Sequence, residues 1–225
     1  MNNYDVIIIG AGAAGLMCAI EAGKRGRRVW IVDHGKKTAE KIRISGGGRC
    51  NFTNIHTKPD CFLSQNPHFC RSALSRYKPA DFIALVDKHG IKWHEKKLGQ
   101  LFCDDSAQQI IDMLLTECRE AGVRLNMETT VSAVTPRDGG YFISTDHGDA
   151  QCQSLVIATG GLSIPKIGAT KFGYDIARQF GLSVIPTRAG LVPLTFTDEL
   201  AGRCKDMTGL SVEASVHFEK TAFAE

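Results

Sequence analysis

Apolar residues near the start of the chain fall into two short runs on either side of a helix-like segment. Residues 4–9 form one apolar, β-branched run, and residues 29–32 form the other. Residues 13–25, between them, have the composition of a helix that ends before Gly26. Short runs that are apolar throughout are typical of strands buried on both faces of a parallel sheet. The pattern therefore predicts a strand–helix–strand unit with helices packed on the sheet.

The middle of the chain predicts an inserted segment that returns to the same sheet. Residues 36–78 are polar and Gly-rich at first and then irregular. A helix is expected from Pro79 to Gly90, and residues 91–103 resemble a hairpin that turns near residues 97–100. Ser106 is a candidate cap for a second helix that ends at Gly122, and residues 123–126 are expected to return as a sheet strand.

Alternating and apolar stretches continue after this insertion. Residues 129–152 alternate and contain two turn signals, which predicts a small antiparallel meander. Residues 155–158 are expected to form another buried strand, and residues 172–180 a helix. Residues 210–218 alternate like a half-buried strand for which the remaining sequence shows no partner. We therefore expect the chain to be the N-terminal portion of a longer protein.

Composition narrows the class of protein. Hydrophobic residues make up 43% of the chain, charged residues 23%, and the net charge is +3 over 225 residues. This balance predicts a globular protein whose partners include neither nucleic acid nor a membrane. The 8 cysteines are irregularly spaced and form no C-x-x-C pair, so we expect free thiols and no metal site. The apolar run at residues 6–20 is too short to span a bilayer, and a cytoplasmic location is expected.

The sequence GAGAAG at residues 10–15 lies between the first predicted strand and helix. In this context Gly10 makes the tight turn, Gly12 lets a pyrophosphate approach the backbone, and Gly15 lets the helix pack on the strand. Ala13 and Ala14 would present their amides to the phosphates at the helix N-terminus. The motif predicts a dinucleotide site.

Asp33 follows Gly10 by 23 positions, at the end of the second predicted strand. A carboxylate there accepts hydrogen bonds from ribose hydroxyls and repels a 2′-phosphate, which argues against NADP at this site. His34 and Gly35 continue the same turn and belong to the predicted site.

The strand at residues 155–158 runs into Ala158, Thr159, Gly160 and Gly161. A sheet of this kind can hold NAD or FAD. The order of strand–helix–strand, meander and then Ala-Thr-Gly resembles the FAD domain of the glutathione-reductase type, so FAD is favoured. Val131, at the start of the meander, is included in the predicted site.

This order of elements predicts an α/β fold: a Rossmann-like parallel sheet with a β-meander, followed by the start of a second β-rich domain. We expect the FAD-binding domain to span residues 1–190, with an inserted segment at about residues 36–122. Residues 191–225 would begin the second domain, which we expect to be truncated.

The run ISGGGRCN at residues 44–51 predicts a close approach of the backbone to another group. Glycines lower the stability of helices and strands, and they are tolerated where a side chain has no room. The run follows the second strand, on the expected side of the dinucleotide, and Lys41 adds a further cation. The predicted cofactor contacts here are Lys41, Ser45, Gly46, Gly47, Gly48, Arg49, Cys50 and Asn51. The alternative is a surface loop with solvated cations.

Residues 5–54 resemble the YhiN/BaiN-type family of bacterial FAD-dependent oxidoreductases. The resemblance continues in LGQLFCDDSA at 98–107, ATGGLSIPKIGATKFGYDIA at 158–177 and LVPL at 191–194. The chain departs from the family pattern at Ala39 and Glu40, where the family often has Gly-Arg, and at Cys103, where it has proline. The family's C-terminal segment, which completes the flavin site, does not occur in this sequence.

The resemblance implies a flavoprotein oxidoreductase that transfers hydride to or from a small organic substrate, with NAD(P)H as a candidate electron donor. Two alternatives stay open. One is a non-catalytic dinucleotide-binding protein or truncated remnant of an enzyme. The other is flavin-dependent RNA modification, which has less support because the sequence shows no basic patch or aromatic platform. No catalytic residue is identified: structural roles are favoured for the lone histidines His94 and His217, and Cys50 has no C-x-x-C partner for a redox role. The oligomeric state is left open.

Overall fold

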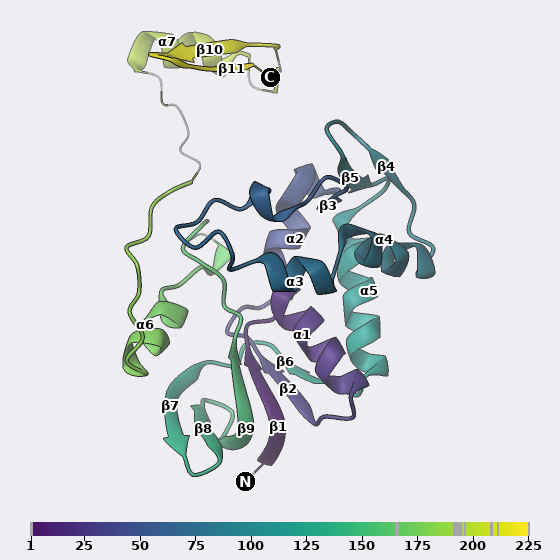
Figure 1. Ribbon diagram of the computed structural model, residues 1–225, viewed down its shortest axis with the longest axis vertical. Coiled ribbons are helices and arrows are strands. Elements are labelled where there is room, and N and C mark those ends of the chain that lie inside the picture. The colour runs from purple at the N-terminus through teal and green to yellow at the C-terminus, as the bar shows by residue number, and fades with distance from the viewer. Residues whose placement is uncertain are drawn as a thin grey trace. The chain divides into compact units, whose positions relative to one another are not determined.

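The computed structural model describes residues 2–164, 167–190, 195, 197–207, 209–210 and 212–224 (Figure 1). These residues form two compact units, one up to Val184 and one from Ile185 onward. The family's LVPL segment at 191–194 and residues 165 and 166 of its ATGG stretch lie outside the described residues.

A six-stranded sheet forms the centre of the first unit, in the order β6-β2-β1-β9-β8-β7. Strands β6, β2, β1 and β9 run parallel to one another, whereas β8 pairs with β9 and β7 with β8 in the antiparallel direction. The α/β fold predicted from the sequence, with a Rossmann-like parallel sheet, is confirmed. The strand bounds are β1 Asn2–Ile9, β2 Val29–Val32, β6 Arg124–Asn126, β7 Val131–Arg137, β8 Gly140–Thr145 and β9 Ala150–Ile157.

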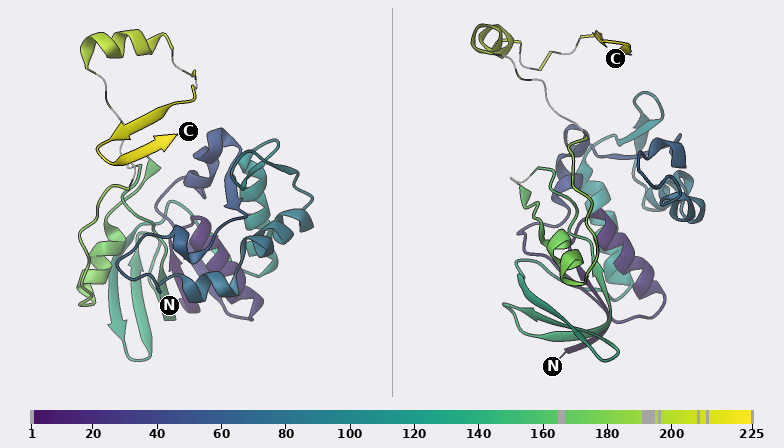
Figure 2. Two further views of the ribbon diagram at one scale, coloured as in Figure 1. Left: turned by 45° about the horizontal axis from the view of Figure 1, so that its top comes forward. Right: turned by 60° about the vertical axis from the view of Figure 1, so that its left-hand side comes forward.

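Helices α1 (Ala13–Lys24) and α5 (Ala107–Glu120) lie together on one face of this sheet (Figures 1 and 2). Ile8 and Ile31 point toward them and are fully buried with side chains such as Leu16. Burial of this kind contributes roughly 1.5–3 kcal/mol per large aliphatic side chain.

The opposite face of the sheet has a second core, which explains why residues 6–9 of β1 and all of β2 are apolar. Ile7 and Trp30 are buried there, and helix α6 (Phe172–Gln179) packs against this cluster through Phe172 and Ile176. Successive residues of a strand point to opposite faces, so a strand covered on both sides has no position for a polar residue.

The predicted antiparallel meander is formed by β7, β8 and the first part of β9, but it is not separate from the next predicted strand. The predicted meander at residues 129–152 and the predicted strand at 155–158 share one continuous strand, β9. Cys152 of β9 is in register with both Tyr141 of β8 and Tyr4 of β1. The hairpin of β7 and β8 therefore extends the parallel sheet through β9.

The inserted segment carries its own small sheet, in the order β3-β5-β4. The predicted hairpin is formed by β4 (Trp93–Glu95) and β5 (Gln100–Cys103), which are antiparallel. The predicted helix after Pro79 is α4 (Pro79–Lys88). Short elements that were not predicted also occur here: α2 (Glu40–Ile44), a 3-10 turn at Ser45–Gly48, β3 (Asn51–Asn54), a 3-10 turn at Pro59–Cys61, and α3 (Arg71–Arg76).

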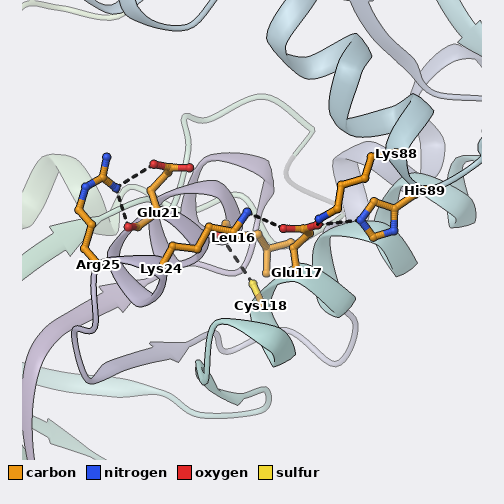
Figure 3. Close-up of polar contacts among 8 residues, drawn as sticks. All are labelled: Leu16, Glu21, Lys24, Arg25, Lys88, His89, Glu117 and Cys118. Atoms are coloured by element: carbon orange, nitrogen blue, oxygen red, sulfur yellow. Dashed lines mark hydrogen bonds and ion pairs between the residues drawn. The ribbon is translucent and has the colours of Figure 1, made fainter.

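Helix α5 begins at the predicted cap and joins the insertion to the Rossmann core. The amide of Gln108 donates to Ser106 Oγ at 3.1 Å, which satisfies one of the free amides of the first turn. Glu117 is fully buried and accepts from Lys24 Nζ of α1 and Lys88 Nζ of α4, each at 2.6 Å (Figure 3). His89 Nε2 lies 2.8 Å from the same carboxylate. One buried carboxylate thus connects three helices.

The second unit contains α7 (Asp198–Lys205) and a hairpin of β10 (Ser215–Phe218) and β11 (Thr221–Ala224). The expectation of a half-buried strand without a partner in the chain is wrong. Its partner is the four-residue strand β11, which was too short to be recognised, and Val216 and Phe218 of β10 are exposed.

Candidate cofactor site

A cavity of about 640 Å³ opens at the carboxyl ends of β1, β2 and β9. Its volume falls within the roughly 300–1,000 Å³ of ligand pockets, and its position is where open α/β sheets bind ligands. The predicted site residues that line it are Gly10, Gly12, Ala13, Ala14, Asp33, His34, Gly35, Lys41, Val131, Ala158, Thr159 and Gly160. Sequence motifs that lie up to 150 residues apart thus meet in one cavity.

Two glycines of the fingerprint are required by the backbone around them. Gly10 has φ +113°, and a Cβ there would lie 2.5 Å from the carbonyl oxygen of Ala158. A Cβ at Gly15 would lie 1.9 Å from the carbonyl oxygen of Gly10. Neither position accepts a side chain, because β1, β9 and α1 meet there at backbone distance.

Gly12 has a different environment. No atom lies within 4 Å of the position its Cβ would take, and the residue faces the cavity. The amide of Leu16 donates the first bond of α1, to the carbonyl of Gly12 at 3.0 Å. The amides of Ala13, Ala14 and Gly15 therefore have no partner within the helix. An open volume in front of free amides fits a diphosphate.

Asp33 supports this loop from the neighbouring strand. Its Oδ2 accepts from the amide of Ala11 and its Oδ1 from the amide of Gly35, both at 2.7 Å. A carboxylate has about four lone-pair positions, so hydrogen bonds from ribose hydroxyls can be added to these two. The residue lines the cavity, as the predicted ribose contact requires.

Three lysines line the cavity wall, the predicted Lys41 together with Lys37 and Lys171, and Lys171 is paired with Asp175 at 3.6 Å. Lys41 Nζ donates to Ser163 Oγ at 2.9 Å, which connects α2 to the loop after the Ala-Thr-Gly turn. Lys171 belongs to the start of α6, whose Phe172 and Asp175 also line the cavity. The sequence indicated a helix there, but nothing in its pattern showed that its first turn would face the cofactor site.

The glycine run lies apart from this cavity. Residues 45–51 are not among its lining residues, and neither are Gly15 and Gly161. A Cβ at Gly46 would lie 2.6 Å from the ring of Phe102, and the amide of Cys103 donates to the carbonyl of Arg49 at 2.9 Å. The run packs against β5, and its predicted contacts with a flavin stay a prediction.

Thiol and imidazole groups give no further catalytic assignment. Burial raises the pKa of the Cys50 thiol and raises that of Cys103 to about 11, so both are protonated at neutral pH. His94 Nδ1 lies 2.7 Å from Asp104 Oδ1, outside the cavity lining. Among the described residues, no group of His, Cys, Asp and Glu could hold a metal ion, and no described helix is long and apolar enough to cross a membrane.

Comparison with known proteins identifies relatives along the whole chain. A ribosomal RNA dihydrouridine synthase of Escherichia coli is 54% identical over 226 residues, covering 100% of this chain and 56% of the relative. A protein of the same name from Haemophilus influenzae is 52% identical over 203 residues, covering 88% of this chain and 51% of the relative. The chain thus spans about half the length of these curated relatives.

These relatives overturn the expectation of a small-molecule partner and no nucleic acid, because both are named for an activity on ribosomal RNA. The expectation was drawn from the small net charge and from lysines and arginines that are mostly scattered along the sequence. Neither shows which basic side chains gather on one exposed surface of the folded chain.

The fold agrees with that of known flavoproteins. The open conformation of a flavocytochrome c3 fumarate reductase matches with a TM-score of 0.55 at 20% identity, over 79% of this chain and 40% of that one. The family model described as "HI0933-like protein Rossmann domain" matches residues 4–213. The chain therefore belongs to the HI0933-like Rossmann-domain family, which comprises the YhiN/BaiN-type FAD oxidoreductases, and it has their FAD-binding oxidoreductase fold.

Proposed function

We propose that this chain forms the FAD-binding part of a flavin-dependent reductase that converts uridine to dihydrouridine in ribosomal RNA. The observation that carries the proposal is the identity of 54% over the whole chain to a ribosomal RNA dihydrouridine synthase. The dinucleotide cavity supports it, since saturation of the C5–C6 double bond of uracil consumes a hydride and a proton.

FAD, when bound, would supply the hydride. Each part of the cavity then has a defined task. The free amides at the start of α1 would bind the diphosphate, with Gly12 leaving the room that it needs. Asp33 would orient the adenosine ribose while its backbone contacts hold the fingerprint loop in place. Lys37, Lys41 and Lys171 would offset the negative charge of the phosphates.

An electron donor has to restore the reduced flavin after each turnover, and we propose NAD(P)H for this step. The donor is oxidised by two electrons, and the uracil is reduced by the same two. Asp33 disfavours a 2′-phosphate in the fingerprint site, so NADP(H) would bind elsewhere.

The proposal can be tested by measuring the dihydrouridine content of ribosomal RNA in cells. Cells that encode this protein would be compared with cells from which its gene is removed, and nucleosides from purified ribosomal RNA would be measured by mass spectrometry. We expect a dihydrouridine to disappear with the gene and to return with the unaltered protein. Gly12→Val should not restore it, because the valine side chain fills the diphosphate position.

Gly190→Val is the matched control, since Gly190 also has open space around its Cβ position but does not line the cavity. Unchanged dihydrouridine after removal of the gene would overturn the proposed function.

A further inference from the structure

The inserted segment contains a stretch rich in exposed basic residues. Residues 55–78 contain four basic residues, Lys58, Arg71, Arg76 and Lys78, and one acidic residue, Asp60. Their formal charge is +3, which equals the charge of the whole chain, with 27 basic and 24 acidic residues. The remaining residues sum to 23 of each sign, although residues 24–28, with four basic and no acidic residues, are a second cluster of positive charge.

The four basic side chains are available to a ligand. All four residues are exposed. Among the described residues, none of the four forms an ion pair, whereas Arg25, Arg43 and Arg203 on other surfaces are paired with glutamates. His56 and His68 are also exposed in this segment.

Large apolar side chains are exposed between these cations. Phe69 is 82% exposed and Leu63 98%, and Phe62 and Tyr77 are exposed as well. Apolar groups clustered on a surface indicate a binding site. Aromatic rings interleaved with unpaired cations match a single-stranded nucleic acid, whose bases stack on rings while its phosphates meet the cations.

Two thiol contacts connect parts of the segment's backbone. Cys70 Sγ donates to the carbonyl of Pro59 at 3.8 Å, which closes residues 59–70 into a compact loop. Cys61 Sγ donates to the carbonyl of His56 at the same distance, and α3 begins directly after this loop. In Figure 1 the segment is the blue run that ends at α3. Compact loops with adjoining ends are frequently functional.

We propose that residues 55–78 bind an unpaired stretch of RNA. The four cations contact its phosphates, and Phe62 and Phe69 stack on its bases. The inference rests on the proposed function and adds to it the surface by which this chain holds its substrate. Charge complementarity selects RNA over a second copy of the chain, because two copies would bring the same excess of positive charge together.

Binding of a short, labelled oligouridylate to the whole chain can be measured by fluorescence anisotropy, and variants of the segment then test this surface. The double variant Arg71→Ala with Arg76→Ala should weaken binding and reduce the slope of log Kd against log salt by about 1.4, at roughly 0.7 for each single-strand phosphate contact. Arg27→Ala with Arg119→Ala is the matched control. Both of these arginines are exposed and unpaired among the described residues, and they lie outside the segment.

Stacking of bases on Phe69 is tested with the variant Phe69→Ala. Phe218→Ala is the control, because Phe218 is also an exposed phenylalanine, at 72%, but belongs to the second unit. Loss of one stacked base should raise Kd roughly 5- to 150-fold, and the control should leave Kd unchanged. All six substituted positions are exposed, so the variants are expected to fold, and far-UV circular dichroism would verify this.

Three outcomes would overturn the proposal: no binding of the oligouridylate by the unaltered chain, equal losses in segment and control variants, or normal RNA binding by Phe69→Ala combined with loss of self-association. The ribosomal RNA measurement described under Proposed function is independent of these outcomes. If the RNA surface fails its test, the dihydrouridine can still depend on the gene. If the proposed function fails, the dihydrouridine persists after the gene is removed.

Discussion

The carboxylate of Asp33 accepts a hydrogen bond of 2.7 Å from the amide of Ala11, in the middle of the glycine fingerprint. The end of β2 is thereby connected to the turn after β1, and the same carboxylate faces the cavity. Asp33 thus has a structural task in addition to the ribose contact predicted from its spacing.

Asp33→Ala should weaken FAD binding by roughly 1.5–3 kcal/mol, the range for hydrogen bonds to a charged group. The measurement is titration of the apoprotein with FAD, followed by flavin fluorescence. Asp5→Ala is a suitable control, because Asp5 Oδ2 also accepts from a backbone amide, that of Arg28 at 2.7 Å, at the other end of β1. Equal FAD affinity in both variants would remove Asp33 from the ribose site.

Gly12→Val should abolish dinucleotide binding while the protein stays folded. Gly12 has φ −84°, which valine adopts, and its Cβ meets no protein atom within 4 Å. Gly15→Ala should instead unfold or distort the domain, because its Cβ would lie 1.9 Å from the carbonyl oxygen of Gly10. Thermal unfolding and FAD titration of the two variants separate these effects. A folded Gly12→Val variant with normal FAD affinity would place the cofactor elsewhere.

Features encoded within a few consecutive residues could be predicted from the sequence. The apolar runs of β1 and β2, the cap at Ser106 and the fingerprint turn each follow from local composition, and the cavity includes the fingerprint residues Gly10 and Gly12. Contacts between distant residues could not be predicted. Gly46 lies against Phe102, more than 50 positions further along the chain, and no local pattern indicates that pairing.

The basic surface escaped prediction for a different reason. The net charge of +3 is a sum over the whole chain, and it does not show that residues 55–78 hold four basic residues and one acidic residue. The aromatic residues among them, such as Phe69, are expected in a core on composition alone. Only the structure shows that Phe69 is 82% exposed.

The glycine run provides a third prediction. Gly47 has φ +66° and no atom within 4 Å of its Cβ position, so Gly47→Ala should cost roughly 1–2 kcal/mol of folding free energy from the left-handed backbone alone. The stability gain that alanine brings to an ordinary surface loop is therefore not expected here. Gly46→Ala should cost more, since its Cβ would also lie 2.6 Å from Phe102.

FAD titration of the folded Gly47→Ala variant shows whether the run contacts the cofactor. The backbone penalty of Gly47→Ala lowers the stability of the fold and not the affinity of the folded protein for FAD. A loss of FAD affinity in the folded variant would therefore indicate that the run contacts the cofactor. Unchanged affinity and flavin potential would mean that the three glycines serve only the turn that packs on β5.

Glu117 makes the stability of the fold depend on pH. Hydrogen bonds from Lys24, Lys88 and His89 lower the pKa of this buried carboxyl from 4.5 to about 2. A lowered folded-state pKa stabilises the protein above the unfolded-state value, and the stabilisation is lost as the pH falls toward the folded-state value. The free energy of unfolding should therefore decrease between about pH 5 and pH 2, by roughly 3 kcal/mol from this group.

Glu117→Gln should remove most of that pH-dependent stability, because an amide cannot ionise and offers only one acceptor to two ammonium groups. Urea unfolding at several pH values measures it. Glu21→Gln is the control, since Glu21 pairs with Arg25 on the exposed side of α1 (Figure 3), and exposed pairs contribute little. If Glu117→Gln kept the full acid dependence, that dependence would have to arise from other carboxylates, and the contact of α5 with α1 and α4 would rest on apolar packing.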